Sequence, residues 1–328
     1  MLEKVLAGLI APPFLLGAAV APVDHAEEVF SFRDSDIIES SGLVVVGGLV
    51  VTTNDSGDTG RVFTVDPATG ETVGVTGWSH DPTDVEALAP FGDHEVWAGD
   101  IGDNNESRDR IQVSPVPVGP GNRDVDAPVY DLVYPDGPHN AETLMSDPTN
   151  GRLYVATKGT LGGTLYAAPA QLSADHPNEL EPLGAVLPIA TDGAFLADGQ
   201  HVVIRNYAVA VVYAFPSLEE VAELRLPDQE QGEGLAVEPD GTLLLSSEGL
   251  HSPVLRVTLP ALSDAVGPTA SPTPSPSPAG SAGPSPGSQG ASTPSRAGES
   301  ERPVWPWFLG GLVGLGCVVV LVRSLRPR

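Results

Sequence analysis

Short apolar runs separated by turn residues fill the central part of the chain. The runs 43–46, 153–156 and 209–213 have the length of strands and are rich in Val, Leu and Tyr, which is typical of β-structure. The segments 66–70 and 147–151, which both open with Asp-Pro and close with Gly, separate such runs and indicate tight hairpins. The pattern therefore predicts an all-β domain.

One phrase recurs along these runs: an acid or a serine, a small residue, an apolar strand, a turn, and a second strand that ends in polar residues. The repeats begin 41 to 56 residues apart, and units of this size with four strands each are typical of propeller blades. Five units predict a five-bladed β-propeller over residues 27–265. We call the residues that open the five units the leading residues: Ser41, Glu86, Glu142, Asp192 and Glu233.

The last unit has one strand too few, whereas the segment 28–33 before the first unit has the pattern of an unassigned strand. We expect this N-terminal strand to complete the last blade and to close the ring, because closure removes exposed sheet edges. An irregular sandwich is the alternative fold. A six-bladed propeller would need a further unit within residues 105–135, where the pattern shows none.

The leading residues predict a metal site. The innermost strand of each blade begins near the axis of a propeller, so these five side chains should converge in one channel. Four carboxylates this close cannot all stay ionised unaided, so either their pKa values rise or a cation lies among them. A ring of oxygen ligands suits Ca²⁺ best. Alternatively, each acid caps backbone N–H groups of neighbouring strands. The predicted metal ligands are Ser41, Glu86, Glu142, Asp192 and Glu233.

The residues that end the second strands should surround the same face. Acids and bases are mixed there, a combination that can hold a phosphorylated or sugar ligand through a bound metal. Residues 27–265 contain no Gly-x-Ser-x-Gly elbow and no His-Glu-x-x-His motif, which are signatures of hydrolases. The ligand-site candidates are Asp55, Asp58, Asp100, Asp103, Asn104, Arg108, His139, Lys158, Arg205, Tyr207 and Glu248.

The chain is strongly acidic, with 43 acidic and 16 basic residues and a formal net charge of −27. A surface of this sign argues against a nucleic-acid partner bound through a basic patch. The one cysteine, Cys317, excludes an intrachain disulfide. The acidic domain must therefore be stabilised by a large apolar core.

Both ends of the chain carry patterns that are typical of targeting and membrane-anchoring segments. Residues 1–26 contain an apolar run followed by small residues, which predicts a signal peptide, with a buried helix as the alternative. Residues 266–303 consist almost entirely of Gly, Pro, Ser, Thr and Ala and predict a disordered stalk. Residues 304–322 carry no charge, and the tail 323–328 is basic. A single transmembrane helix with a cytoplasmic tail is predicted, which places the propeller outside the cell membrane.

Several phrases of the domain also resemble a known family. They are Asn54–Asp58, Gly99–Asn104, Tyr134–Pro138 with Asn140–Glu142, and Gln231–Leu235. Together they resemble a family of exported β-propellers of high-GC bacteria, labelled WD40-like or phytase-esterase-like, and this resemblance implies a propeller fold.

The five leading residues are themselves similar to the ring of calcium-activated apyrase, a five-bladed nucleotidase with Ser and Glu around a central calcium ion. Ser41, Glu86, Glu142 and Glu233 match its Ser and Glu positions, whereas the fourth blade has Asp192. This second resemblance implies calcium at the centre of the ring.

Two classes of function follow from these patterns. The first is a membrane-anchored binding or scaffold module at the cell surface, with a central calcium ion and an extracellular ligand or protein as its partner. The alternative is a metal-dependent extracellular hydrolase of phosphate esters. We expect a monomer in both cases. Fold alone does not distinguish these functions, because propellers serve both.

Overall fold

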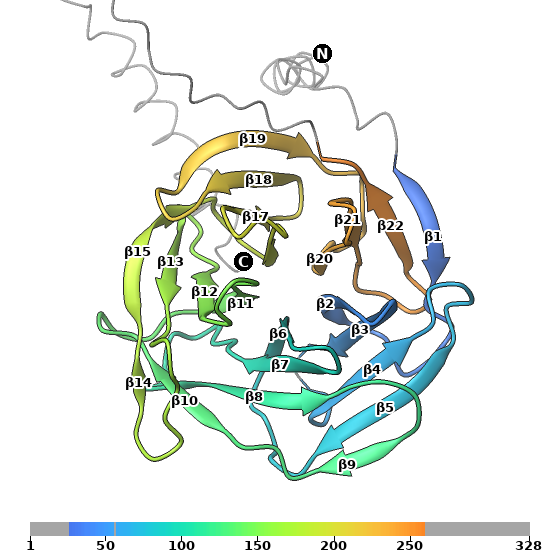
Figure 1. Ribbon diagram of the computed structural model, residues 1–328, viewed down its shortest axis with the longest axis horizontal. Helices are drawn as coiled ribbons and strands as arrows, with labels where there is room; N and C mark the ends of the chain where they lie inside the picture. The colour runs from blue at the N-terminus through green and yellow to red at the C-terminus, as the bar shows by residue number, and fades with distance from the viewer. Residues whose placement is uncertain (1–25, 56, 260–328) are drawn as a thin grey trace, which may run out of the picture. The chain divides into compact units, whose positions relative to one another are not determined.

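The computed structural model of the protein describes residues 26–55 and 57–259, which form 22 β-strands in five sheets. The five sheets surround a common centre as the blades of a propeller (Figure 1). The described residues contain no α-helix. The predictions of an all-β fold and of five blades are therefore confirmed.

In the first four blades the innermost strand comes first in the chain, and in the fifth blade β1 from the N-terminal end of the domain is the outermost strand. The first blade contains β2 (Ser40–Val46), β3 (Leu49–Asn54), β4 (Arg61–Val65), β5 (Thr72–Trp78) and β9 (Arg123–Val125). The second contains β6 (Val85–Phe91), β7 (Glu95–Asp100), β8 (Ile111–Pro117), β10 (Tyr130–Val133) and β14 (Asn178–Glu179). The third contains β11 (Ala141–Ser146), β12 (Leu153–Thr157), β13 (Gly163–Ala167) and β15 (Glu181–Val186). The fourth contains β16 (Asp192–Phe195), β17 (His201–Arg205), β18 (Val209–Ala214) and β19 (Glu219–Arg225). The fifth contains β20 (Leu235–Val237), β21 (Leu243–Leu245), β22 (Pro253–Val257) and β1 (Glu27–Ser31).

The N-terminal strand closes the ring. Strand β1 lies antiparallel to β22 as the outer strand of the fifth blade (Figure 1), with Glu27 opposite Arg256 and Ser31 opposite Pro253. Phe30 and Phe32 pack edge to face, with ring centroids 5.6 Å apart, in the core between the fifth and first blades. The predicted closure is present, and it joins the two ends of the domain through both backbone pairing and apolar burial.

Two blades gain a fifth strand from their neighbours. Strand β9 lies parallel to β5 and comes from the long connection between β8 and β10. Strand β14 lies parallel to β10 and comes from the connection between β13 and β15. These additions cover the outer edges of the first and second blades, which otherwise would remain open for pairing.

The apolar core is divided into five clusters of buried side chains, one at each junction between blades. Phe63 and Leu244, for example, meet between the first and fifth blades, and Tyr154 and Phe195 meet between the third and fourth. Strands are buried on both faces in such an arrangement, which explains their continuous apolar runs. Close packing of this kind holds the inner strands, and hence the leading residues, in fixed positions.

The predicted signal peptide (apart from Ala26), stalk, transmembrane segment and basic tail lie outside the described residues. Among residues 26–55 and 57–259, no helix has the length and the apolar character needed to span a membrane.

Candidate functional site

Backbone irregularities interrupt the strand pairing at three of the leading residues. The pairing of β6 with β7 skips Glu86, and the pairing of β11 with β12 skips Glu142. In the first blade the register shifts between Ser40 and Leu43, across Ser41. A β-bulge leaves one residue unpaired and redirects its side chain. The bulges therefore place Ser41, Glu86 and Glu142 in a distinct environment at the start of their strands, and we call this end of the channel the acidic end.

Asp55, Asp84 and Glu86 form the group at the acidic end that can hold a metal ion. One carboxylate oxygen from each lies within 4.8 Å of the other two. Asp84 and Glu86 are buried, and Asp55 follows β3 of the adjacent blade. The Oγ of Ser41 donates to the Oε2 of Glu86 at 3.0 Å, which adds a hydroxyl oxygen beside the group.

The backbone N–H of Asp84 is hydrogen-bonded to Asp100, whereas one carboxylate oxygen of Asp84 has no partner. The backbone N–H groups of Thr83 and Asp84 donate to the carboxylate of Asp100, at 3.0 and 2.9 Å. Asp100 is in turn bound by Arg108 at 2.7 Å. The Oδ1 of Asp84 is buried and has no hydrogen-bond partner. A buried carboxylate oxygen without a partner is costly unless something binds it, and a divalent cation would satisfy it.

The pKa values of the acidic end reflect burial and mutual repulsion. Burial first, and then the charges of Glu142, Asp55 and Asp84, raise the pKa of Glu86 to about 10. Burial and the charge of Asp55 raise the pKa of Asp84 to about 6. Burial and the charge of Glu233 raise the pKa of Glu142 to about 8. Carboxylates that repel one another in this way are the environment in which a cation binds most favourably.

A chain of polar contacts continues across the acidic end from Glu142 to Glu248. Lys158 forms an ion pair with Glu142 and donates to the hydroxyl of Tyr207 at 2.9 Å. The Tyr207 hydroxyl donates to the Oε1 of Glu233 at 3.1 Å, and Gln231 bridges Glu233 to Glu248. The Oε2 of Glu233 is buried without a partner. Burial, followed by the charge of Glu233, raises the pKa of Glu248 to about 7.

Asp192 is placed differently from the other leading acids. It pairs in regular register with Arg205, without a bulge, and its side chain is fully buried. Its carboxylate accepts from the backbone N–H groups of Leu235 at 2.6 Å and Gly193 at 2.8 Å. These are the contacts of a backbone cap, the alternative that the sequence left open.

Arg205 is also fully buried, and it connects the fourth and fifth blades. Its guanidinium donates to the backbone oxygen of Gly234 at 3.1 Å and to the side chain of Gln229 at 3.0 Å. Burial lowers its pKa to about 10, and the charges of Glu233 and Asp192 oppose this shift. Arg205 therefore lies beneath the acidic end as a structural cation.

The remaining ligand-site candidates have local partners. Asp58 pairs with Arg61 at 2.8 Å. Asp103 accepts from the backbone N–H groups of residues 107 and 108, at 2.6 and 2.7 Å. Asn104 accepts from Asn140, and His139 contacts Asp136 and the hydroxyl of Tyr166.

The sequence did not single out Asp84. Its signal was present as the pair Asp84 and Glu86 at alternate positions, which a regular strand would place on one face. The sequence places Asp55 among the ligand-site candidates, whereas the structure brings it against Asp84 and Glu86. A single ion held by all five leading residues stays a prediction. The ligand group that the described residues offer takes one member, Glu86, from that ring.

No family model and no curated protein matches the chain. One solved structure to which the chain is similar bears the description "glucose dehydrogenase". The two are 12% identical, with a TM-score of 0.44, and the similarity covers 72% of this chain and 100% of that chain. A likeness this distant carries no argument about activity. The resemblances to exported propellers and to apyrase rest on the sequence phrases alone.

Proposed function

We propose that the protein is a cell-surface binding module that holds a calcium ion at the acidic end of its propeller and uses this end to bind an extracellular protein. One observation carries the proposal: Asp55, Asp84 and Glu86 converge within 4.8 Å, and the buried Oδ1 of Asp84 has no partner. Calcium accepts several oxygen ligands in irregular geometry. Carboxylates from two blades with the Ser41 hydroxyl close by suit that preference.

Exposed apolar side chains around the same end support a protein partner. Ile38, Leu161, Tyr207 and Leu250 are 47%, 102%, 40% and 57% exposed. Each lies in a loop that precedes an inner strand or follows a second strand, and such loops flank the leading residues. Large apolar residues exposed around a polar centre are typical of protein-binding surfaces.

The alternative, a hydrolase of phosphate esters, would need a cation beside the metal to bind the phosphate. The basic candidates at this end are already engaged in the described structure. Lys158 pairs with Glu142, Arg108 pairs with Asp100, and Arg205 is buried under the surface. These contacts favour the binding module over the hydrolase.

The test is thermal unfolding of the full chain in detergent, with chelator, calcium or magnesium. A ligand that binds only the folded state stabilises it by about 2.7 kcal/mol at a hundredfold excess over Kd. Calcium should raise the melting temperature more than magnesium does, because magnesium requires a tight octahedral shell. Asp84→Asn should remove most of this response, whereas the control Asp93→Asn, an exposed acid outside the group, should retain it.

Two results would count against the proposal. Equal melting temperatures in chelator and in calcium would show that the folded protein binds no calcium ion. Calcium-dependent release of phosphate from a panel of phosphate esters, lost in Asp84→Asn, would replace the binding module with the hydrolase.

A further inference from the structure

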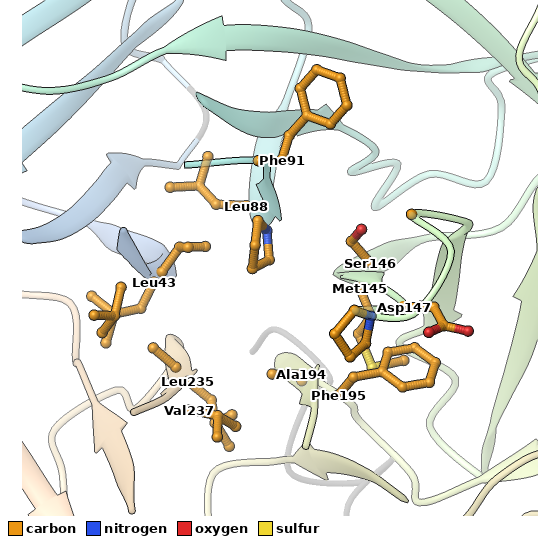
Figure 2. A pocket seen from close by; sticks show the side chains of 18 of the residues that line it. Leu43, Leu88, Phe91, Met145, Ser146, Asp147, Ala194, Phe195, Leu235 and Val237 are labelled. Carbon is orange, nitrogen blue, oxygen red and sulfur yellow. The ribbon is translucent and has the colours of Figure 1, made fainter. Parts of the chain in front are cut away.

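The same five inner strands line a second, apolar cavity (Figure 2) with a volume of about 430 Å³. In three blades its lining begins two positions after the leading residue, at Leu43, Leu88 and Leu235, and in the fourth blade it begins one position after Asp192, at Gly193. It continues to the last residues of the strands, including Phe91 and Val237. Because each leading residue is the first or second residue of its inner strand or lies just before that strand, the cavity opens at the opposite end of the channel from the leading residues. We call it the apolar cavity.

The lining of the apolar cavity has a defined chemistry. It is formed mainly by Leu, Val, Pro, Met and Phe side chains, and Figure 2 shows Leu88, Met145, Phe195 and Val237 around an open centre. No lysine, arginine or histidine belongs to the lining, whereas two acids, Asp93 and Asp147, do.

The two acids of the lining differ. The carboxylate of Asp147 is satisfied by its own turn, since Thr149 and Asn150 donate to it at 2.7 Å. Asp93 is exposed, so its charge acts at the rim. The cavity is thus apolar inside and negative at its edge.

We propose that the apolar cavity binds a small apolar molecule that is neutral or positively charged, and that it rejects anionic amphiphiles. The volume lies in the range of about 300–1,000 Å³ that is usual for small-molecule sites. A bound apolar molecule would gain by leaving water. A carboxylate or sulfonate would meet the acid at the rim and the strongly acidic domain behind it. This site does not depend on the calcium ion or on the partner proposed for the acidic end.

Two dyes that share one aromatic body test the proposal. N-phenylnaphthylamine is neutral, and anilinonaphthalenesulfonate adds one negative charge to the same rings. Each is titrated by fluorescence into the full chain, with the same detergent for every variant. The neutral dye should show a saturable, one-to-one component, and the anionic dye should bind about tenfold more weakly or not at all.

Matched variants locate this component. Ala194→Leu adds a larger side chain to the lining of the cavity and should weaken binding of the neutral dye at least about tenfold. Ala68→Leu makes the same change at an exposed turn and should leave binding unchanged. Equal binding by Ala194→Leu and Ala68→Leu, or no saturable component in the unaltered chain, would overturn the proposal. So would binding that strengthens on dilution as an oligomer dissociates, since a second copy would then be the occupant.

A charge variant keeps the test valid if Ala194→Leu does not fold. Asp93→Lys changes only an exposed side chain and should strengthen binding of the anionic dye about threefold. The neutral dye should be unaffected. An anionic dye that binds the unaltered chain as well as the neutral one does, and ignores Asp93→Lys, would overturn the charge selectivity.

Discussion

The two ends of the channel are built from the same five strands, yet their chemistry is opposite. At the start of the strands, bulges remove Glu86 and Glu142 from the regular ladder and gather carboxylates whose pKa values are raised. A few residues later the pairing is regular, and Leu88 and Met145 belong to an apolar cavity. A local change of register is thus enough to give one strand two chemically different ends.

The difference also separates two kinds of stability. The acidic end is held by charge-assisted contacts and by burial of ionisable groups, so its free energy depends on pH and on bound ions. The opposite end of the channel, around the apolar cavity, is the apolar end, and it is held by side-chain packing, which responds little to pH or to bound ions.

The largest effect is expected for Arg205→Met. The substitution removes a fully buried guanidinium that binds Gly234 and Gln229 and that opposes the charges of Glu233 and Asp192. Removing one partner from such a buried network costs about 3–5 kcal/mol. Urea unfolding of the full chain would measure this loss. Arg110→Met, at an exposed ion pair, is the control and should lose less than about 1 kcal/mol. Equal losses would show that the acidic end has no structural cation.

A smaller loss, about 2–4 kcal/mol, is expected for Leu88→Ala at the apolar end. Leu88 is 2% exposed and packs between the first and second blades. Because the loss comes from apolar packing, urea unfolding should give the same value at pH 5 and pH 8, and with chelator or calcium. A loss that changes with calcium would show that the two ends are coupled and would break the comparison.

The repeat predicted the architecture well because each blade buries its strands in the same way. Apolar runs, hairpin turns and leading residues recur with the blade, so the number of blades and the closing strand at 28–33 follow from the sequence. The added strands β9 and β14 do not follow, because they are two or three residues long and pair with blades other than the one that their neighbours in the chain enter.

The site could be predicted only in outline. The leading residues mark the acidic end, but the direction of each side chain depends on a bulge that the sequence does not reveal. Glu86 and Glu142 are bulged, whereas Asp192 stays in register and caps Leu235. The apolar cavity was missed because its residues read as ordinary strand positions.

The pH dependence comes next in size and concerns the acidic end alone. The folded-state pKa values of Asp84, Glu142 and Glu86 are raised to about 6, 8 and 10. A raised pKa means that the folded state holds its proton more tightly than the unfolded chain does. The stability that these three carboxyl groups contribute is fully present below about pH 4, the pKa of the unfolded chain. It is lost as the pH rises through the folded-state pKa values.

Without divalent cations, the free energy of unfolding should therefore fall by about 2 kcal/mol between pH 5 and pH 9, after allowance for solvent screening. Thermal or urea unfolding at several pH values would measure this slope. Calcium should flatten it, because a bound cation stabilises the ionised carboxylates. Asp84→Asn should flatten it partly. A stability that rises with pH in chelator would contradict the raised pKa values.

The smallest effect, a gain of about 0.5–1 kcal/mol in chelator at pH 8, is expected for Glu233→Gln. Glutamine has nearly the same shape and can keep the Oε1 contacts with Tyr207 and Gln231, at 3.1 and 3.3 Å. It removes a negative charge whose Oε2 is buried without a partner and which raises the pKa of Glu142. Less repulsion among the carboxylates should stabilise the folded state. At pH 5 the gain should be smaller, because burial raises the pKa of Glu233 and the carboxyl carries less negative charge there than at pH 8. The control Glu95→Gln, at an exposed position beside the apolar end, should change stability by less than about 0.5 kcal/mol at either pH. If Glu233→Gln instead destabilises the protein at pH 8, then Lys158 and Arg205 already compensate its charge, and the acidic end is a neutralised network with less need of an ion.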